Sequence, residues 1–177
     1  QRAYEQAMLA EAVRSAELQQ WPNKMLIATP SNSYQLDRQI AAFARRLLDN
    51  KATKEDQQLV GALKFARNGH WRRAYLILSF LKDRANSSGG DDAKLRFDLT
   101  KLVLTRNRDK IEQAYLEALN EAREKDNEAT QKQLARKMYD WKAEDPQLRK
   151  ALLSYFQNAD DDHRFEEMAS RMLITDP

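Results

Sequence analysis

The chain has 177 residues, of which 30 are Lys or Arg and 27 are Asp or Glu, so its formal net charge is only +3. It contains no cysteine, which excludes disulfides and thiol chemistry and argues against a zinc centre. Only 4 Gly and 4 Pro stand among many helix-forming residues, so the composition predicts helix throughout. No apolar run approaches the roughly 20 residues that cross a bilayer, and no signal-peptide pattern is visible.

Residues 1–52 are predicted to form an N-terminal helical segment that packs on the rest of the chain. Residues 1–20 have the composition of a helix, and Trp21-Pro22 ends it because the residue before a proline is disfavoured in the helical conformation. Ser33 is a suitable cap for a second helix. The apolar side of that helix repeats at three- and four-residue steps: Leu36, Ile40, Phe43, Ala44, Leu47 and Leu48.

Residues 53–85 predict two antiparallel helices joined by a tight turn. The run from Thr53 to Asp56 resembles a capping box with Asp in place of Glu, which starts the first helix. Asn68-Gly69 ends it, since glycine adopts a left-handed conformation without a steric penalty. The second helix carries a wide apolar stripe that predicts cover on several sides: Trp71, Ala74, Tyr75, Ile77, Leu78, Phe80 and Leu81.

The same hairpin resembles the tetratricopeptide repeat (TPR) family. The matching positions are a small residue, an aromatic, Gly-x-aromatic-x-x-Ala and a large apolar residue: Ala62, Phe65, Gly69, Trp71, Ala74 and Leu78. The usual closing Ala is replaced by Leu81, the early Trp position holds Gln58, and the terminal Pro is absent. The match therefore covers one hairpin, and the rest of the chain is similar in period and apolar pattern only.

Further helices and turns are predicted to follow the central hairpin. Residues 86–90 form a Ser/Gly-rich stretch that predicts a flexible loop. Helices then resume near Asp91, with turns near Asn107, 126–127, 145–146 and 160–162. Ala74, Ala114 and Ala151 occupy equivalent positions, 40 and 37 residues apart.

This pattern predicts an all-α fold. We expect a right-handed stack of antiparallel helical hairpins, a TPR-like α-solenoid of about nine helices. Residues 53–177 would form the hairpins and a terminal capping helix. A globular helical bundle is the rival arrangement.

Candidate catalytic and metal-binding residues are few. His70 and His163 lie beside predicted turns and lack metal-ligand spacing. Asp160 to Asp162 suit a helix N-terminus better than a calcium loop, which needs alternating ligands, a Gly and a distal Glu. We therefore expect no enzyme activity, no metal and no cofactor, and an enzyme of helical fold is a minor alternative.

The TPR resemblance implies where a partner would bind. In that family the first helix of each hairpin lines a concave groove that holds segments of partner proteins, with basic residues and Asn binding carboxylates. Arginine suits this task because its planar guanidinium binds a carboxylate with two hydrogen bonds. The residues expected in the groove by this resemblance are Arg67, Arg96, Arg106, Asn107 and Arg136, with Leu63 and Val103 as an apolar floor.

These features favour a protein-interaction scaffold or adaptor that binds a partner polypeptide within a larger assembly. The resemblance extends this to bacterial envelope-associated assemblies. The alternative is a nucleic-acid-binding helical repeat, for which the basic pairs at 45–46, 72–73 and 106/108 are the evidence. Because the sequence starts without Met, we interpret it as part of a longer protein. We expect a cytoplasmic location, with a membrane tether outside this sequence or a periplasmic location as the other options.

Overall fold

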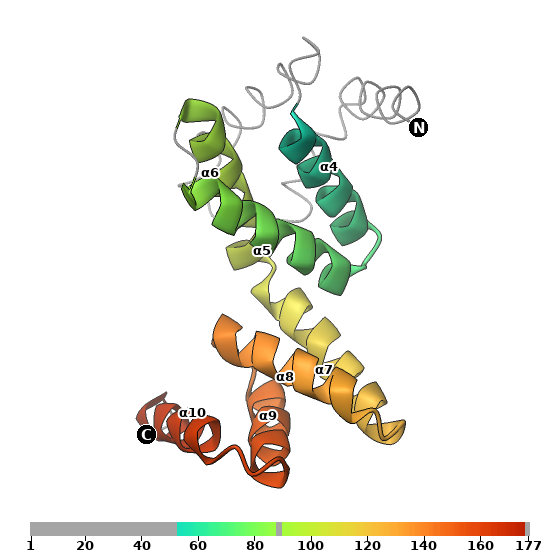
Figure 1. The fold of residues 1–177 in the computed structure, drawn as a ribbon, viewed down its shortest axis with the longest axis vertical. Coiled ribbons are helices and arrows are strands. Elements are labelled where there is room, and N and C mark those ends of the chain that lie inside the picture. The colour runs from blue at the N-terminus through green and yellow to red at the C-terminus, as the bar shows by residue number, and fades with distance from the viewer. Residues whose placement is uncertain (1–52, 88–89, 176–177) are drawn as a thin grey trace. The chain divides into compact units, whose positions relative to one another are not determined.

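The computed structural model describes residues 53–87 and 90–175, and these residues are all-helical (Figure 1). They form seven helices, without a strand among them: α4 (Lys54–Arg67), α5 (Trp71–Ser87), α6 (Asp91–Arg106), α7 (Arg108–Glu124), α8 (Glu128–Trp141), α9 (Pro146–Asn158) and α10 (Asp162–Thr175). The prediction of an all-α fold is confirmed. The predicted N-terminal segment 1–52, and residues 88–89 of the predicted flexible loop, lie outside the described residues. Residues 86–87, predicted as the start of that loop, instead complete α5, so the loop prediction is wrong there.

The chain divides into two compact units at the boundary between Arg108 and Asp109. Unit 1, as described, consists of residues 53–108 and contains α4, α5 and α6. Unit 2 consists of residues 109–175 and contains α7 to α10. Each unit is considered by itself below.

The predicted start and end of α4 are both confirmed. The Thr53 hydroxyl accepts a hydrogen bond from the backbone N–H of Asp56 at 3.2 Å, and the Asp56 carboxylate accepts one from the N–H of Thr53 at 3.0 Å. This reciprocal pair is a capping box, which satisfies donors that a helix start otherwise leaves unpaired. Gly69 has a φ of 79°, the left-handed conformation that turns the chain from α4 into α5.

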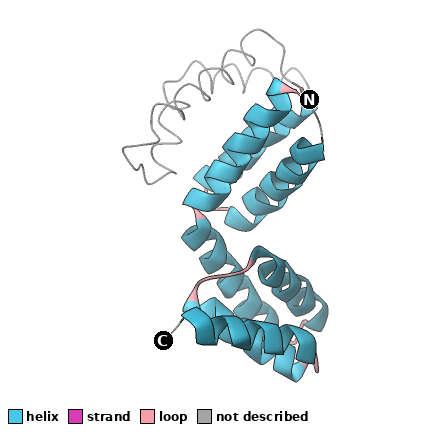
Figure 2. Ribbon diagram, turned by 90° about the vertical axis from the view of Figure 1, so that its left-hand side faces the viewer, coloured by secondary structure: helices cyan, strands magenta, loops and turns pink. Residues whose placement is uncertain are grey.

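The core of unit 1 is centred on α5, which packs against both α4 and α6 (Figures 1 and 2). Ala74 of α5 is completely buried, as expected of a small residue at a helix crossing. A buried ion pair adds a link between α4 and α6: Arg96 donates to the Asp56 carboxylate at 3.2 Å. The other apolar residues of this core include Leu59, Val60, Ala62, Trp71, Tyr75, Leu78, Leu81 and Leu104.

Among the described helices, α4 and α6 leave one face of α5 exposed. The wide apolar stripe predicted a helix buried on several sides, and this prediction holds for the faces toward α4 and α6. Leu76 and Phe80, however, are 45% and 51% exposed. For Phe80, which belongs to the predicted stripe, the expectation of cover is wrong, because the described helices α4 and α6 occupy only two sides of α5.

The local signals in unit 2 also match the structure. Asp126 has a positive φ of 50° at the turn between α7 and α8, and the Asn127 side chain caps α8 by accepting from the N–H of Thr130 at 3.1 Å. Asp145 caps α9 by accepting from the N–H of Leu148 at 2.8 Å. Pro146 occupies the first turn of that helix, where its missing N–H costs nothing.

A buried carboxylate holds the connection between α8 and α9. Glu112 of α7 is only 3% exposed, and its two oxygens accept from the backbone N–H groups of Glu144 and Asp145 at 2.6 and 3.2 Å. The apolar core around this contact comes from α7 to α10: Ile111, Tyr115, Leu116, Leu119, Leu134, Met138, Leu148, Leu152, Phe156 and Met168. Ala114 and Ala151, predicted to be equivalent to Ala74, are only half-buried.

A polar and aromatic cluster links α10 to α8. The Tyr139 hydroxyl of α8 donates to Glu167 of α10, and Arg171 pairs with the same carboxylate. The Arg164 guanidinium lies 5.4 Å from the centre of the Tyr139 ring, within cation–π range. The Phe156 ring of α9 meets Tyr139 edge-to-face with their centres 5.7 Å apart. These contacts fix α10 against the rest of unit 2.

Candidate partner-binding surfaces

The residues predicted for a concave groove have different environments in the structure. Arg67 and Arg136 are exposed, while Arg106 and Leu63 are half-buried. Arg96 is committed to the buried Asp56 carboxylate at 3.2 Å, so its guanidinium stabilises unit 1. It therefore has a structural role that the sequence prediction did not include.

Two of the predicted groove residues lie in the core. Asn107 is 1% exposed, and its side-chain amide donates to the backbone carbonyl of Val103 at 2.8 Å. Val103 is itself buried. Neither side chain is available to a partner. The other predicted residues are divided between unit 1 and, for Arg136, unit 2, so their convergence on one surface stays a prediction.

The structure reveals a different concave site within unit 2. A groove of about 450 Å³ is lined by the end of α7, the turn after it, the start of α8 and the last two turns of α9. This volume falls within the roughly 300–1,000 Å³ of typical ligand sites. We call it the unit 2 groove. Its lining residues are Leu119, Asn120, Arg123, Asp126, Glu128, Gln131, Ala151, Ser154, Tyr155, Asn158 and Ala159.

Uncharged polar residues are the largest group in the lining of the unit 2 groove, five of eleven, beside three charged and three apolar residues. Asn120 and Asn158 are exposed, and each amide offers donors and an acceptor. The Gln131 amide donates to the carbonyl of Ala122 at 3.4 Å, which leaves its oxygen as an acceptor. Arg123 contributes one positive charge.

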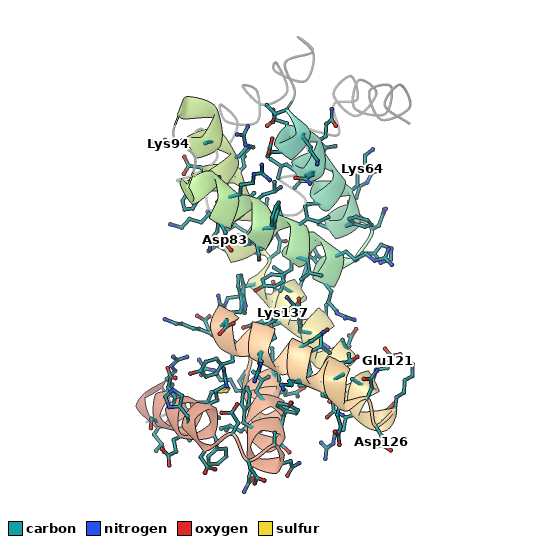
Figure 3. The ribbon with its side chains drawn as sticks, viewed as in Figure 1. Lys64, Asp83, Lys94, Glu121, Asp126 and Lys137 are labelled. Atoms are coloured by element: carbon teal, nitrogen blue, oxygen red, sulfur yellow. The ribbon has the colours of Figure 1, made fainter. Side chains whose placement is uncertain are left out.

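Acidic residues at the α7–α8 turn limit the positive charge of this site. Asp126 and Glu128 outnumber Arg123, so the lining has a formal charge of −1; Asp126 is labelled at the turn in Figure 3. The groove therefore presents hydrogen-bonding groups more than net charge.

Tyr155 is the one groove residue whose acidity is clearly changed. Burial raises the pKa of its phenol above the ordinary value of 10.0; Arg136 opposes the shift, and Asp161 and Glu128 reinforce it. The phenol is thus protonated at neutral pH, and its hydroxyl can both donate and accept a hydrogen bond.

Neither histidine forms part of a catalytic or metal cluster. His70 and His163 are both exposed, and the His70 ring packs edge-on against Phe65 with centres 6.3 Å apart. Within residues 53–87 and 90–175, no three His, Cys, Asp or Glu side chains come together in a way that could hold a metal ion.

Residues 53–108 and residues 109–177 differ in the sign of their formal charge. Residues 53–108 contain 12 Lys or Arg and 6 Asp or Glu, a formal charge of +6. Residues 109–177 contain 11 basic and 16 acidic residues, a formal charge of −5. The net charge of the whole chain, +3, does not show this division, because charges of opposite sign cancel in the sum.

The sequence gives only weak signals of the unit 2 groove and of the exposed apolar residues on α5. Asn120 and Asn158 are exposed polar residues near helix ends, but 38 residues separate them and only the tertiary packing brings them to one groove. Phe80 belongs to the predicted apolar stripe of α5 and was therefore expected in the core, whereas the exposed Leu76 lies outside that stripe. Exposure of such residues is decided by the neighbouring helices, which periodicity does not specify.

Comparisons with known proteins add no relative from which a role could be transferred. No family model matches the chain, and neither a curated protein nor a solved structure resembles it significantly. In the part of the chain that the structure describes, none of the helices combines the length and apolarity that a membrane span requires. The chain is thus characterised by its own architecture: two compact helical units of opposite charge, with a polar groove in the second.

Proposed function

We propose that this chain is a polypeptide-binding scaffold built from TPR-like helical hairpins, which acts as an adaptor within a larger assembly. The observation that carries this proposal is the unit 2 groove, an open site of about 450 Å³ lined by three successive helices. Helices that stack side by side create such extended surfaces without a deep catalytic cavity. The stacked arrangement of hairpins throughout the chain is part of the proposal.

The groove lining suits a polypeptide ligand. A peptide main chain presents alternating N–H donors and C=O acceptors, and a side-chain amide can satisfy both kinds of group. Asn120 of α7 and Asn158 of α9 supply such amides from two helices that line the groove, with Ser154 and Tyr155 adding hydroxyls. This arrangement favours binding over catalysis, because its amides and hydroxyls can orient a chain without exchanging protons at neutral pH.

Selection from a random peptide library, with the whole chain as the target, tests this function. Calorimetry would then measure the affinities of the enriched peptides. We expect Asn120→Ala with Asn158→Ala to weaken groove-binding peptides at least about fivefold, since each lost hydrogen bond is worth about 0.5–1.5 kcal/mol. Lys150→Ala is the matched control, because Lys150 is exposed on α9 and does not line the groove. Failure to enrich any peptide, or full affinity of all enriched peptides for the double variant, would contradict the proposed groove.

Nucleic-acid binding is the second candidate function. It is favoured by the formal charge of +6 on residues 53–108, since clustered Lys and Arg bind phosphates through counterion release. This function predicts that the affinity for a single-stranded RNA falls steeply as the salt concentration rises. Salt-independent or undetectable RNA binding would remove it.

A further inference from the structure

A row of four exposed side chains runs along the face of α5 that the described helices α4 and α6 leave open. Arg72, Leu76, Phe80 and Arg84 follow one another at four-residue steps, so they lie on one side of the helix. All four are exposed, and the row spans about 18 Å at 1.5 Å per residue. We call this row the α5 ridge. Two apolar side chains occupy its centre, and an arginine stands at each end.

The charged end of the α5 ridge is ordered by neighbouring side chains. The Arg84 guanidinium lies 5.9 Å from the centre of the Phe80 ring. It also pairs with Glu55 of α4 at 3.4 Å. Arg84 is more than half exposed, so this pair is weak and a partner carboxylate could replace or share it. Phe80 and Arg84 therefore present an aromatic ring and a cation side by side.

The surroundings of the ridge are also basic. Arg73 is exposed beside Arg72, and Lys82 is near Arg84 in the sequence. The acids near this end are Glu55, which pairs with Arg84, and Asp83, which is labelled in Figure 3. The described part of unit 1 carries a formal charge of +6. A surface of this sign attracts acidic partners and accelerates their association.

We infer that the α5 ridge is a docking site for an acidic amphipathic helix of a partner protein. Two large apolar side chains of the partner would cover Leu76 and Phe80, and carboxylates about one turn beyond each of them would pair with Arg72 and Arg84. Apolar burial provides the affinity, and the arginines select against basic helices. This inference rests on the proposed polypeptide-binding function and assigns it a second surface with its own ligand chemistry.

Two other classes of ligand fit the α5 ridge less well. An interfacial membrane helix presents a continuous apolar face to the lipid, whereas this ridge offers two apolar residues between charges, on a helix that α4 and α6 hold on both sides. A nucleic-acid site requires a concentrated basic stripe along the phosphates. Leu76 and Phe80 instead interrupt the basic residues at the centre of the ridge.

The test is a selection of displayed helical peptides, about 18 residues long, against the whole chain. We expect the enriched peptides to combine apolar residues at helical spacing with flanking Asp or Glu. One enriched peptide is then synthesised, together with a version in which every Asp and Glu is replaced by Lys. The acidic peptide should bind the chain at least about tenfold more tightly than its basic version.

Variants of the chain locate the binding site. Leu76→Ser with Phe80→Ser should weaken the acidic peptide about tenfold or more, and Arg72→Glu with Arg84→Glu should do the same. Leu173→Ser is the matched apolar control, since Leu173 is 80% exposed in unit 2. Lys137→Glu with Lys150→Glu is the matched charge control. Both controls should bind as the unmodified chain does, and circular dichroism should show equal helix content in all variants.

The outcomes separate this inference from the function on which it rests. If peptides are enriched but bind the α5 ridge variants with full affinity, the ridge is not the site, while the scaffold function stands. If no peptide is enriched by either selection, both fail. Binding of anionic phosphatidylglycerol vesicles or single-stranded RNA that the ridge variants abolish, with no binding of the acidic peptide, would overturn the inference in favour of a membrane or nucleic-acid surface.

Discussion

Removing the Glu112 carboxylate should destabilise unit 2 more than any exposed charge substitution. This side chain is 3% exposed and accepts hydrogen bonds from two consecutive backbone N–H groups, at Glu144 and Asp145. Both N–H groups belong to the turn that joins α8 to α9. Glu112→Ala leaves them without that acceptor and opens a small cavity at the start of α7.

The magnitude follows from the number and type of these bonds. A hydrogen bond to a charged group contributes about 1.5–3 kcal/mol, so two give about 3–6 kcal/mol. Glu144 is exposed, and its N–H can regain water when the carboxylate is removed. The lower end of the range therefore applies, about 3 kcal/mol for Glu112→Ala. Glu112→Gln keeps the shape and one acceptor oxygen, and should cost about 1–2 kcal/mol.

Denaturant unfolding followed by circular dichroism would measure the loss, and backbone amide exchange would locate it. In the unmodified chain the amides of Glu144 and Asp145 should exchange slowly, and in Glu112→Ala they should exchange faster. Glu117→Ala is the matched control on the same helix. Glu117 is exposed, and its carboxylate accepts a hydrogen bond from the exposed Gln113 side chain at 3.2 Å. Unchanged stability of Glu112→Ala, or unchanged exchange at these two amides, would refute the role of Glu112.

Three further predictions concern local features. Ala74→Leu should cost about 1–3 kcal/mol of unfolding free energy, because Ala74 is fully buried in the core of unit 1 and a larger side chain overpacks that core; an unchanged denaturation midpoint would contradict it. Gly69→Ala should lower the free energy of unfolding, because Gly69 has a φ of 79° at the turn between α4 and α5. Gly61→Ala should instead stabilise α4 by about 0.5–1 kcal/mol. Open space surrounds both positions, so the two variants differ only in the backbone conformation of the replaced glycine. Burial alone would raise the pKa of Asp161, but hydrogen bonds from Arg164 outweigh it and leave that pKa below 3.8. Its contribution to stability is therefore present above pH 3.8 and lost as the pH falls through the folded-state pKa, and Asp161→Asn should remove this acid dependence in a pH series of unfolding curves.

Features that depend on neighbouring residues could be predicted from the sequence. The capping box at Thr53 involves residues three apart, and the turn at Gly69 requires only the conformational freedom of one residue. Asp145 and Pro146 start α9 for equally local reasons. These signals predict the helices and many of their ends, because the interactions behind them join residues within about one helical turn of each other.

Contacts between distant residues could not be predicted in the same way. Asp56 and Arg96 are 40 residues apart, and Glu112 lies 32 and 33 residues from its two donors. No local pattern marks such pairs, since any of 27 acids and 30 basic residues offered the same chemistry. The sequence does not predict the unit 2 groove, for the same reason. Its walls come from helices whose packing depends on these long-range contacts.

The environments of Arg96 and Asn107 also determine which experiments can locate a partner surface. Replacing Arg96 removes the charge that pairs with the buried Asp56 carboxylate, and an uncompensated buried charge destabilises a fold strongly. Replacing Asn107 removes the amide that donates to the carbonyl of Val103 in the core. Either change would weaken partner binding simply by loosening unit 1, so a loss of binding in these variants would not identify an interface. Substitutions at exposed residues such as Leu76, Phe80 and Asn158 separate binding from folding, and for this reason they are the positions on which the function of the chain should be tested.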